Sequence, residues 1–158
     1  MPLVMSRRLR LALLAAAGSA ALLAGAFIFQ AMGYAPCKLC LWQRWPHAAA
    51  FGVGLLMVAG LGLRFLPLVG ALAAATTGVL GVYHAGVEQK WWQGPDTCTS
   101  GDIAGVSTDD LLNQIMAAPL VRCDEIPWQF LGISMAGWNA LLSFVLAALW
   151  IAAATRRD

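Results

Sequence analysis

The sequence predicts an all-α membrane protein in which residues 1–158 form a single four-helix domain. The first observation behind this prediction is composition. Hydrophobic residues make up 60% of the chain and charged residues 11%, against roughly 25% charged in a soluble domain. A chain of 158 residues cannot bury that much apolar surface within itself, so lipid must cover the rest. This excludes a disordered chain, a coiled coil and a soluble nucleic-acid-binding protein, so no nucleic-acid partner is expected.

The second observation is that four apolar segments have the length of membrane-spanning helices. They cover residues of about 11–32, 45–63, 65–87 and 130–154. The first segment holds 22 residues without a charged side chain. At 1.5 Å per residue it reaches roughly 33 Å, enough to cross a hydrocarbon core of about 30 Å. Lipid offers no partner for backbone N–H and C=O groups, so each span is expected to be helical.

The first span could also be a signal peptide, and Ser6-Arg7-Arg8 resembles the start of a twin-arginine signal. A signal core has about 7–15 apolar residues, fewer than this span holds. No soluble domain follows it for export. We therefore expect an anchor helix.

The third observation is the placement of basic residues, which favour the cytoplasmic side of a membrane. One side of the four spans carries the basic residues Arg7, Arg8, Arg10, Arg64, Arg156 and Arg157, with Asp158 as its acid. The other side carries Lys38, Arg44, Lys90 and Arg122, with the acids Glu88, Asp96, Asp102, Asp109, Asp110, Asp124 and Glu125. Both termini are therefore expected in the cytoplasm. Two loops, about 33–44 and 88–129, are expected to face outward.

All four cysteines lie in these outward loops, on the oxidising side of the membrane where disulfides persist. Cys37 and Cys40 form a Cys-Lys-Leu-Cys motif in the first loop. Cys98 and Cys123 lie in the second loop with 24 residues between them. Of the three possible pairings, we expect one pair per loop, 37–40 and 98–123.

The two pairs differ in what a disulfide within each pair would do. A Cys-x-x-Cys disulfide closes a small ring and stabilises little, which points to redox chemistry. The 98–123 bridge closes a longer loop, and a structural role is open to it. A non-catalytic four-helix protein with structural disulfides is thus the alternative to a redox enzyme. Zinc sites favour two closely spaced pairs, so no metal site is expected.

Features around the first pair favour a reactive thiol. Pro36 stiffens the approach to Cys37, and Arg44 follows Cys40 by four residues. If the second helix begins near Cys40, both side chains share a face, and the helix dipole adds to the effect of the arginine. Pro46 instead favours a helix start at its own position. Arg44 could also be a cation that extends to the lipid headgroups.

The motif Pro-Cys-Lys-Leu-Cys-Leu-Trp-Gln-Arg at residues 36–44 resembles the signature of the DsbB family, bacterial inner-membrane disulfide-bond formation proteins. The resemblance covers essentially the whole chain, including the four spans and the widely spaced second pair. The stretch Tyr-His-Ala-Gly-Val-Glu at residues 83–88 is also similar to one common in that family. The vitamin K epoxide reductase family has the same ingredients, but its Cys-x-x-Cys follows the loop cysteines. Here the Cys-x-x-Cys comes first.

The resemblance implies a quinone-dependent membrane enzyme with its active loops in the periplasm. Its partner is a periplasmic thioredoxin-fold oxidase of the DsbA type, which forms a mixed disulfide with Cys98. Cys123 then attacks Cys37, and Cys40 remains as a thiolate beside the quinone, which Arg44 helps to hold. Ubiquinone is favoured over menaquinone, and the quinol passes its electrons to the respiratory chain.

Two histidines are further candidates for a role at the quinone. His84 lies near the outer end of the third span, where a proton or hydrogen bond could serve quinone reduction. The alternative is a histidine satisfied by Glu88, one helical turn later. His47 has a weaker case of the same kind.

The second loop also predicts a short amphipathic helix. The segment 107–110, Ser-Thr-Asp-Asp, is a good helix start, with acids in the first turn. An apolar stripe follows before Pro119, formed by Leu111, Leu112, Ile115 and Met116. We expect the helix on the outer membrane surface, either controlling the reach of Cys123 or acting as an anchor.

Overall fold

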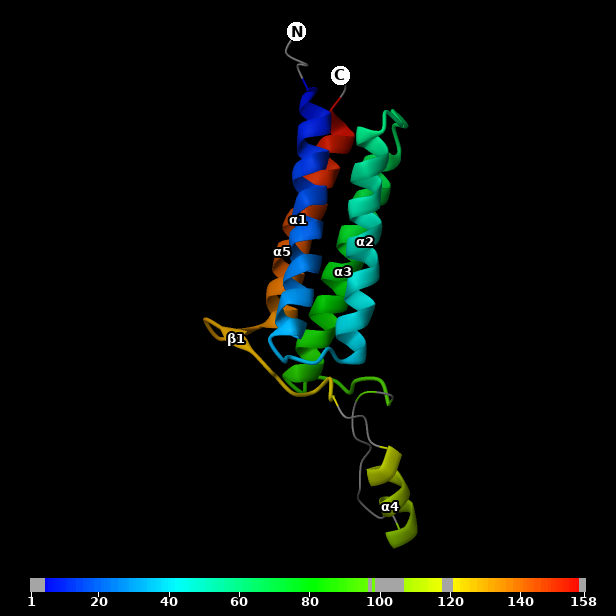
Figure 1. Ribbon diagram of the computed structural model, residues 1–158, viewed down its shortest axis with the longest axis vertical. Coiled ribbons are helices and arrows are strands. Elements are labelled where there is room, and N and C mark those ends of the chain that lie inside the picture. The colour runs from blue at the N-terminus through cyan, green and yellow to red at the C-terminus, as the bar shows by residue number, and fades with distance from the viewer. Residues whose placement is uncertain (1–4, 97, 99–106, 118–120, 157–158) are drawn as a thin grey trace.

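The computed structural model describes residues 5–96, 98, 107–117 and 121–156. These residues form five helices and one two-stranded hairpin: α1 (Arg7–Ala31), α2 (Lys38–Val58), α3 (Leu66–Glu88), α4 (Thr108–Ala117), β1 (Gln129–Phe130), β2 (Ile133–Ser134) and α5 (Met135–Thr155). Four helices, α1, α2, α3 and α5, lie side by side in a bundle, and α4 lies apart from it (Figure 1). The start of α1, the end of α5 and the connection between α2 and α3 meet at one end of the bundle.

Three helices of the bundle, α1, α3 and α5, are long and apolar enough to cross a membrane. The chain is therefore a membrane protein, as expected, with three of the four predicted spans identified by length and composition. The fourth, α2, has 21 residues, or about 31 Å of helix. Its first half contains Lys38, Gln43, Arg44 and His47, which lower its mean hydropathy.

The start of α2 corrects a sequence-based boundary. The helix begins at Lys38, not at about residue 45, and Pro46 lies inside it. Cys37 is the N-cap, and its Sγ accepts a hydrogen bond of 3.3 Å from the N–H of Cys40. The sulfur thus satisfies one of the amide groups that a helix start leaves unpaired, and the helix extends back to the Cys-x-x-Cys motif. Both Cys40 and Arg44 consequently lie on α2.

The start of α5 also differs from the prediction, since it lies at Met135 rather than at about residue 130. Strand β1 pairs antiparallel with β2, so that Gln129 faces Ser134. The turn between the strands uses positive φ angles at Leu131 and Gly132. Ser134 then caps α5 through a hydrogen bond of 3.1 Å from the N–H of Gly137. The apolar residues at 130–134 therefore form a hairpin instead of a helical turn.

Small residues allow close packing between α3 and α5. Ala74, Thr77 and Gly81 on α3 are all buried. A Cβ atom placed on Gly81 would lie 3.0 Å from the backbone oxygen of Ala136. This agrees with the spacing of small residues along the third span, which favours helix packing within a bilayer.

Helix α4 confirms the predicted helix in the second loop. Ser107 Oγ accepts a hydrogen bond of 3.3 Å from the N–H of Asp110. Leu112 and Met116, from the predicted apolar stripe, are exposed. Contact of this helix with a membrane stays a prediction. Pro119, Asp102, Arg157 and Asp158, which the sequence predictions also used, lie outside the described residues.

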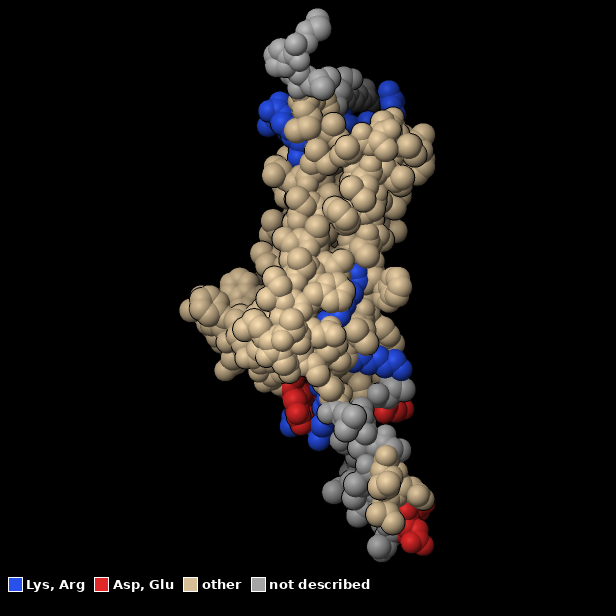
Figure 2. Space-filling model, viewed as in Figure 1, with Lys and Arg blue, Asp and Glu red and all other residues tan. Residues whose placement is uncertain are grey.

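Charged residues separate along the bundle (Figure 2). In that view, Lys and Arg side chains gather at the end that holds the start of α1 and occur again in the other half of the bundle, whereas the visible Asp and Glu side chains lie only at the opposite end and near α4. At the first end, Arg8 Nη2 donates to the carbonyl of Leu63, at 3.1 Å, and ties α1 to the connection between α2 and α3. The separation agrees with the distribution read from the sequence, and the side of the membrane each end faces stays a prediction.

Candidate functional site

The two cysteine pairs converge at the end of the bundle opposite the start of α1. Cys98 and Cys123 form a disulfide, with a distance of 5.4 Å between their Cα atoms. Both are buried in one apolar cluster with Cys37, Leu39 and Val87. The predicted pairing of 98 with 123 is therefore confirmed. The second loop also places its disulfide against the first pair.

The predicted 37–40 disulfide is not what the structure holds. Cys37 and Cys40 are free thiols, with 3.1 Å between their sulfur atoms. The thiol of Cys37 donates a hydrogen bond to Cys40 Sγ. This bond raises the pKa of Cys37 above its ordinary value, and burial acts in the same direction. The two sulfur atoms are joined by a hydrogen bond within the first turn of α2 instead of by a disulfide.

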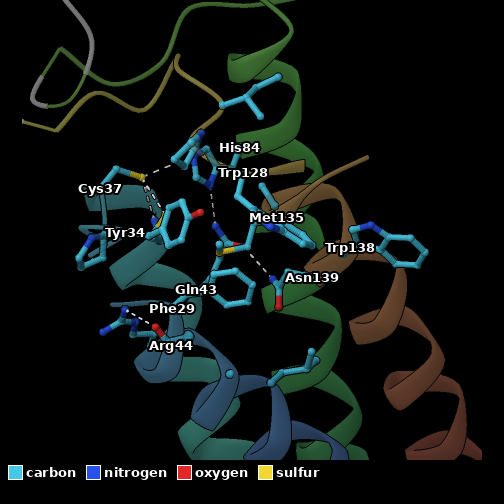
Figure 3. A pocket seen from close by; sticks show the side chains of 18 of the residues that line it. Phe29, Tyr34, Cys37, Gln43, Arg44, His84, Trp128, Met135, Trp138 and Asn139 are labelled. Atoms are coloured by element: carbon cyan, nitrogen blue, oxygen red, sulfur yellow. Dashed lines mark hydrogen bonds between the residues drawn. The ribbon is translucent and has the colours of Figure 1, made fainter. Parts of the chain in front are cut away.

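His84 reaches the first pair from α3 (Figure 3). Its Nε2 lies 3.5 Å from Cys37 Sγ, and its Nδ1 lies 3.0 Å from Nε2 of Gln43. Glu88 Oε1 lies 3.8 Å from the same Nε2, beyond hydrogen-bond length. His84 is therefore within hydrogen-bonding distance of the Cys37 sulfur and of Gln43. Glu88, its partner in the alternative interpretation, lies nearby but too far away for a hydrogen bond.

Arg44 is held against α1 (Figure 3). Its Nη1 donates to Gln30 Oε1 at 2.8 Å, and its Nη2 donates to the carbonyl of Ala26 at 3.4 Å. The guanidinium lies 4.7 Å from the centre of the Phe27 ring, a favourable cation–π distance. Its Nε is buried and has no partner among the described residues. Arg44 is therefore fixed by α1, one helical turn from Cys40.

A cavity of about 580 Å³ opens beside these residues. Its walls come from α1, α2, α3, α5 and the segment 121–130. Cys37, Cys40, Arg44, His47 and His84 all line it, whereas neither Cys98 nor Cys123 does. The first cysteine pair therefore reaches the cavity directly, whereas the second pair lies behind its lining.

Cys37, Cys40 and His84 could in principle hold a metal ion. Their two sulfur atoms and one ring nitrogen all lie within 4.8 Å of one another. Thiolate and imidazole are ligands that zinc prefers. This group of ligands neither confirms nor contradicts the expectation that the chain has no metal site.

An ion pair next to Cys123 escaped the sequence interpretation. Arg122 Nε and Nη2 donate to the two carboxylate oxygens of Asp124 at 3.0 and 2.7 Å. These hydrogen bonds hold the pKa of Asp124 below its ordinary value. The pair forms a bidentate clamp around the backbone of Cys123. The signal in the sequence was a pair of opposite charges, Arg122 and Asp124, on either side of Cys123.

Polar residues within the bundle were also missed, most notably Gln43 and Asn139. Gln43 is buried, and its Oε1 accepts a hydrogen bond of 2.7 Å from Asn139 Nδ2. Asn139 Oδ1 lies 2.8 Å from His47 Nε2. Uncharged amide side chains inside apolar helices were the signal, because such groups need partners when buried. His47 therefore joins a polar network rather than standing alone.

Comparisons with known proteins agree with this site. The family model "Disulfide bond formation protein DsbB" matches residues 7–153. Disulfide bond formation protein B of Paracidovorax citrulli is 32% identical over 152 residues, covering 88% of this chain and 81% of that protein. The protein of the same name from Pasteurella multocida is 32% identical over 142 residues, covering 79% and 75%. No solved structure matches the chain significantly. With the family model spanning nearly the whole chain, the protein belongs to the DsbB family of disulfide bond formation proteins.

Proposed function

We propose that the chain is a membrane thiol:quinone oxidoreductase that reoxidises a periplasmic thioredoxin-fold oxidase of the DsbA type. The observation that carries the proposal is the contact between the two cysteine pairs. The Cys98–Cys123 disulfide is buried against Cys37, and Cys37 and Cys40 in turn line the cavity. Electrons from a dithiol partner would thus pass from the disulfide to the neighbouring first pair, which lines the cavity.

The thiol chemistry balances through successive exchanges. A partner thiolate attacks Cys98, forms a mixed disulfide and releases Cys123 as a thiolate. Cys123 attacks the Cys37 sulfur of an oxidised 37–40 pair, which leaves Cys40 as a thiolate. The second partner thiol then displaces Cys98, and Cys98 re-forms its bond with Cys123 and releases Cys37. The partner leaves oxidised, and the first pair now carries its two electrons and the one proton of its second thiol.

The redox state of the structure corresponds to the end of that exchange. Cys98 and Cys123 are bonded, whereas Cys37 and Cys40 are thiols. The asymmetry between the two thiols supports Cys40 as the thiolate of the pair, because Cys37 donates its proton toward Cys40. Cys40 is also the member next to Arg44 on α2. A positive side chain near the reactive sulfur favours its thiolate form.

The cavity residues fit a quinone as the resident cofactor. Its walls are mostly apolar, and the buried Arg44 Nε has a hydrogen to donate and no partner among the described residues. Arg44, Cys40 and His84 would hold the ring. The Cys37–Cys40 pair would supply two electrons and the proton of Cys37 to a bound quinone, and water would supply the second proton of the quinol that passes to the respiratory chain. DsbA-type oxidants have potentials near −120 mV, and 30 mV corresponds to about 1.4 kcal/mol, so their reoxidation needs an acceptor above the thiol range. Ubiquinone is the proposed species in preference to menaquinone.

The location follows the same proposal. The chain would cross the bacterial inner membrane four times, with α2 as the fourth span. The end that holds Arg8 and Leu63 would face the cytoplasm, as basic residues favour. The cysteine cluster would then face the periplasm, where the partner operates.

The test combines the purified chain in detergent with a reduced DsbA-type protein and a soluble quinone analogue, and follows quinone absorbance. We expect quinone loss with the natural chain and none with Cys40→Ser. The Ser143→Ala variant is the matched control, because that buried hydroxyl has no partner among the described residues and lies outside the cavity lining. Turnover by Cys40→Ser would contradict the proposal. Disulfides that resist a reduced dithiol partner would favour the structural alternative.

A further inference from the structure

A continuous row of hydrogen bonds, buried at His84 and part-buried at Asn139, runs beside the first cysteine pair and joins α2, α3 and α5. From its deep end, the row links His47, Asn139, Gln43, His84 and Cys37. The four successive contacts measure 2.8, 2.7, 3.0 and 3.5 Å. Figure 3 shows Gln43 between His84 and Asn139. This row has no part in the function proposed above, apart from its cysteine end and His84.

The direction of each hydrogen bond is set by two backbone carbonyls. Gln43 Nε2 donates to the carbonyl of Leu39 at 3.0 Å, so this atom is the amide nitrogen and its oxygen faces Asn139. Thr77 Oγ1 donates to the carbonyl of Gln43 at 3.2 Å and therefore accepts from Asn139 Nδ2 at 3.3 Å. A backbone carbonyl only accepts, so neither amide can be turned around without losing a bond.

These directions determine the protonation of both imidazole rings. His84 Nδ1 faces an amide N–H of Gln43 and must accept, so a neutral His84 carries its hydrogen on Nε2. That hydrogen faces Cys37 Sγ, at 3.5 Å, and the backbone carbonyl of Cys123. At the other end, Asn139 Oδ1 must accept, so His47 donates from its own Nε2. Cys37 continues the same donor direction, because its thiol donates to Cys40.

We infer that Gln43, Asn139 and His47 are positioning residues that hold His84 as its Nε2–H tautomer. Every donor in the row then points toward Cys40. Hydrogen bonds in such a chain polarise one another, so a hydrogen bond from His84 to Cys37 Sγ makes the Cys37 thiol a stronger donor to Cys40. While Cys37 is protonated, the effect is to stabilise a thiolate at Cys40. The inference rests on the proposed function for its purpose, because Cys40 is the sulfur proposed to face the quinone.

The same directions oppose metal binding by Cys37, Cys40 and His84. A metal on His84 Nε2 would require the ring hydrogen on Nδ1. That hydrogen would then face the N–H of Gln43, donor against donor, at 3.0 Å. The row therefore assigns His84 to hydrogen-bond donation and leaves the first pair free for thiol chemistry.

The charged and titratable groups around His84 come from three parts of the chain. Glu88 on α3 lies 3.8 Å from Nε2. Cys37 and Cys40 face the ring from the start of α2, and the backbone of Cys123 also contacts it. On β2, the hydroxyl of Ser134, the N-cap residue of α5, interacts with Glu88. A change with pH at this site therefore has two sources, the cysteine pair and Glu88.

The first test reads the tautomer directly by ¹⁵N NMR of histidine-labelled full chain in detergent. The chain has only two histidines, and His47→Phe assigns their signals. We expect the Nε2–H tautomer for His84 in the natural chain. In Gln43→Glu, the carboxylate can only accept, so His84 should carry a hydrogen on Nδ1. An Nδ1–H tautomer in the natural chain would overturn the inference.

The second test measures thiolate at the first pair in a Cys98→Ser/Cys123→Ser background, by absorbance at 240 nm and by reaction with iodoacetamide near neutral pH. We expect Asn139→Leu to slow the modification of Cys40 about fivefold, the equivalent of one hydrogen bond. A Glu88→Gln version of each variant removes the second titrating group. Ser143→Ala, one turn along the same face of α5, should leave the rate unchanged. Equal rates for the natural chain and Asn139→Leu would overturn the inference.

Neither readout uses quinone, so the two proposals fail separately. An Nε2–H tautomer with no quinone reduction would leave the hydrogen-bond row in place and remove its proposed purpose. Quinone reduction with an Nδ1–H tautomer would support the proposed function and overturn the inference about the hydrogen-bond row. Tight zinc binding by the reduced natural chain, lost in His84→Ala, would also overturn the inference, because it requires the opposite tautomer.

Discussion

Arg44 on α2 donates a hydrogen bond of 2.8 Å from Nη1 to Oε1 of Gln30 on α1. This bond joins two helices beside the cavity and holds the guanidinium against α1. It leaves Nε buried and without a partner among the described residues. The contact explains why an arginine, rather than any cation, suits this position: its fork binds α1 while the side chain still lines the cavity.

The first prediction concerns Arg44→Lys. Lysine has no planar fork, so it cannot hold Gln30 and face the cavity at the same time. We expect the KM for a soluble quinone analogue to rise about tenfold, as for the loss of a charged hydrogen bond. The disulfide exchange of Cys98 with a reduced partner should be unchanged when quinone is left out. Arg64→Lys at the opposite end is the control, and an unaltered KM in Arg44→Lys would count against the cavity as the quinone site.

The second prediction concerns the order in which the first pair reacts with iodoacetamide. Cys37 is only 5% exposed, and donation to Cys40 raises its pKa. A raised pKa keeps Cys37 protonated while the pH rises through the ordinary thiol range, at about 8.5. Labelling between pH 7 and 9 should therefore fall on Cys40 first, as measured by mass spectrometry of the peptides. In denaturant both should react alike, and early labelling of Cys37 in the folded protein would contradict the observed direction of the bond.

The third prediction concerns the clamp between Arg122 and Asp124. Because the pKa of Asp124 is lowered, its contribution is present above the ordinary aspartate value of about 4 and is lost as the pH falls through the lowered value. We expect Asp124→Asn to speed the reduction of the Cys98–Cys123 disulfide by a phosphine reductant at pH 5 to 7. The ratio of the two rates should approach one in stronger acid. A ratio independent of pH would show that the carboxylate charge does not hold this segment.

The fourth prediction concerns helix packing at Gly70. A Cβ atom there would lie 2.5 Å from the indole of Trp150, which is completely buried and has no room to move. Gly70→Ala should therefore lower the free energy of unfolding in detergent by about 1–3 kcal/mol, the usual effect of overpacking. Gly52→Ala on α2 is the control, because a Cβ atom there meets nothing within 4 Å. Equal thermal stability of the two variants would contradict the described contact between α3 and α5.

Much of the site could be predicted because its signals are local in the chain. The Cys-x-x-Cys motif, the arginine four residues later and the second pair are all visible as spacings. The confirmed 98–123 bond followed from loop placement alone. The state of the first pair could not be predicted in this way, because the spacing of Cys37 and Cys40 is compatible with both a bond and a shared proton.

Element boundaries failed where two local rules competed. Pro46 favoured a late start for α2, but the helix begins at Lys38 because Cys37 caps it. A proline inside a helix loses one hydrogen bond, and the packing of α2 against α1 and α3 outweighs that loss. Likewise, the apolar run before Met135 forms a hairpin because Gly132 takes a positive φ.

The sequence by itself determined the class of molecule: its apolar composition requires lipid, its basic residues mark one end, and its four cysteines lie together at the other. The tertiary structure alone decided which groups meet. Gln43 and Asn139 are 96 positions apart and bond at 2.7 Å. Packing of α2, α3 and α5 brings these amides together, and buried amides must find partners. Gln43 belongs to the motif at residues 36–44 but Asn139 belongs to none, so only the folded bundle connects Asn139 to the cysteine chemistry.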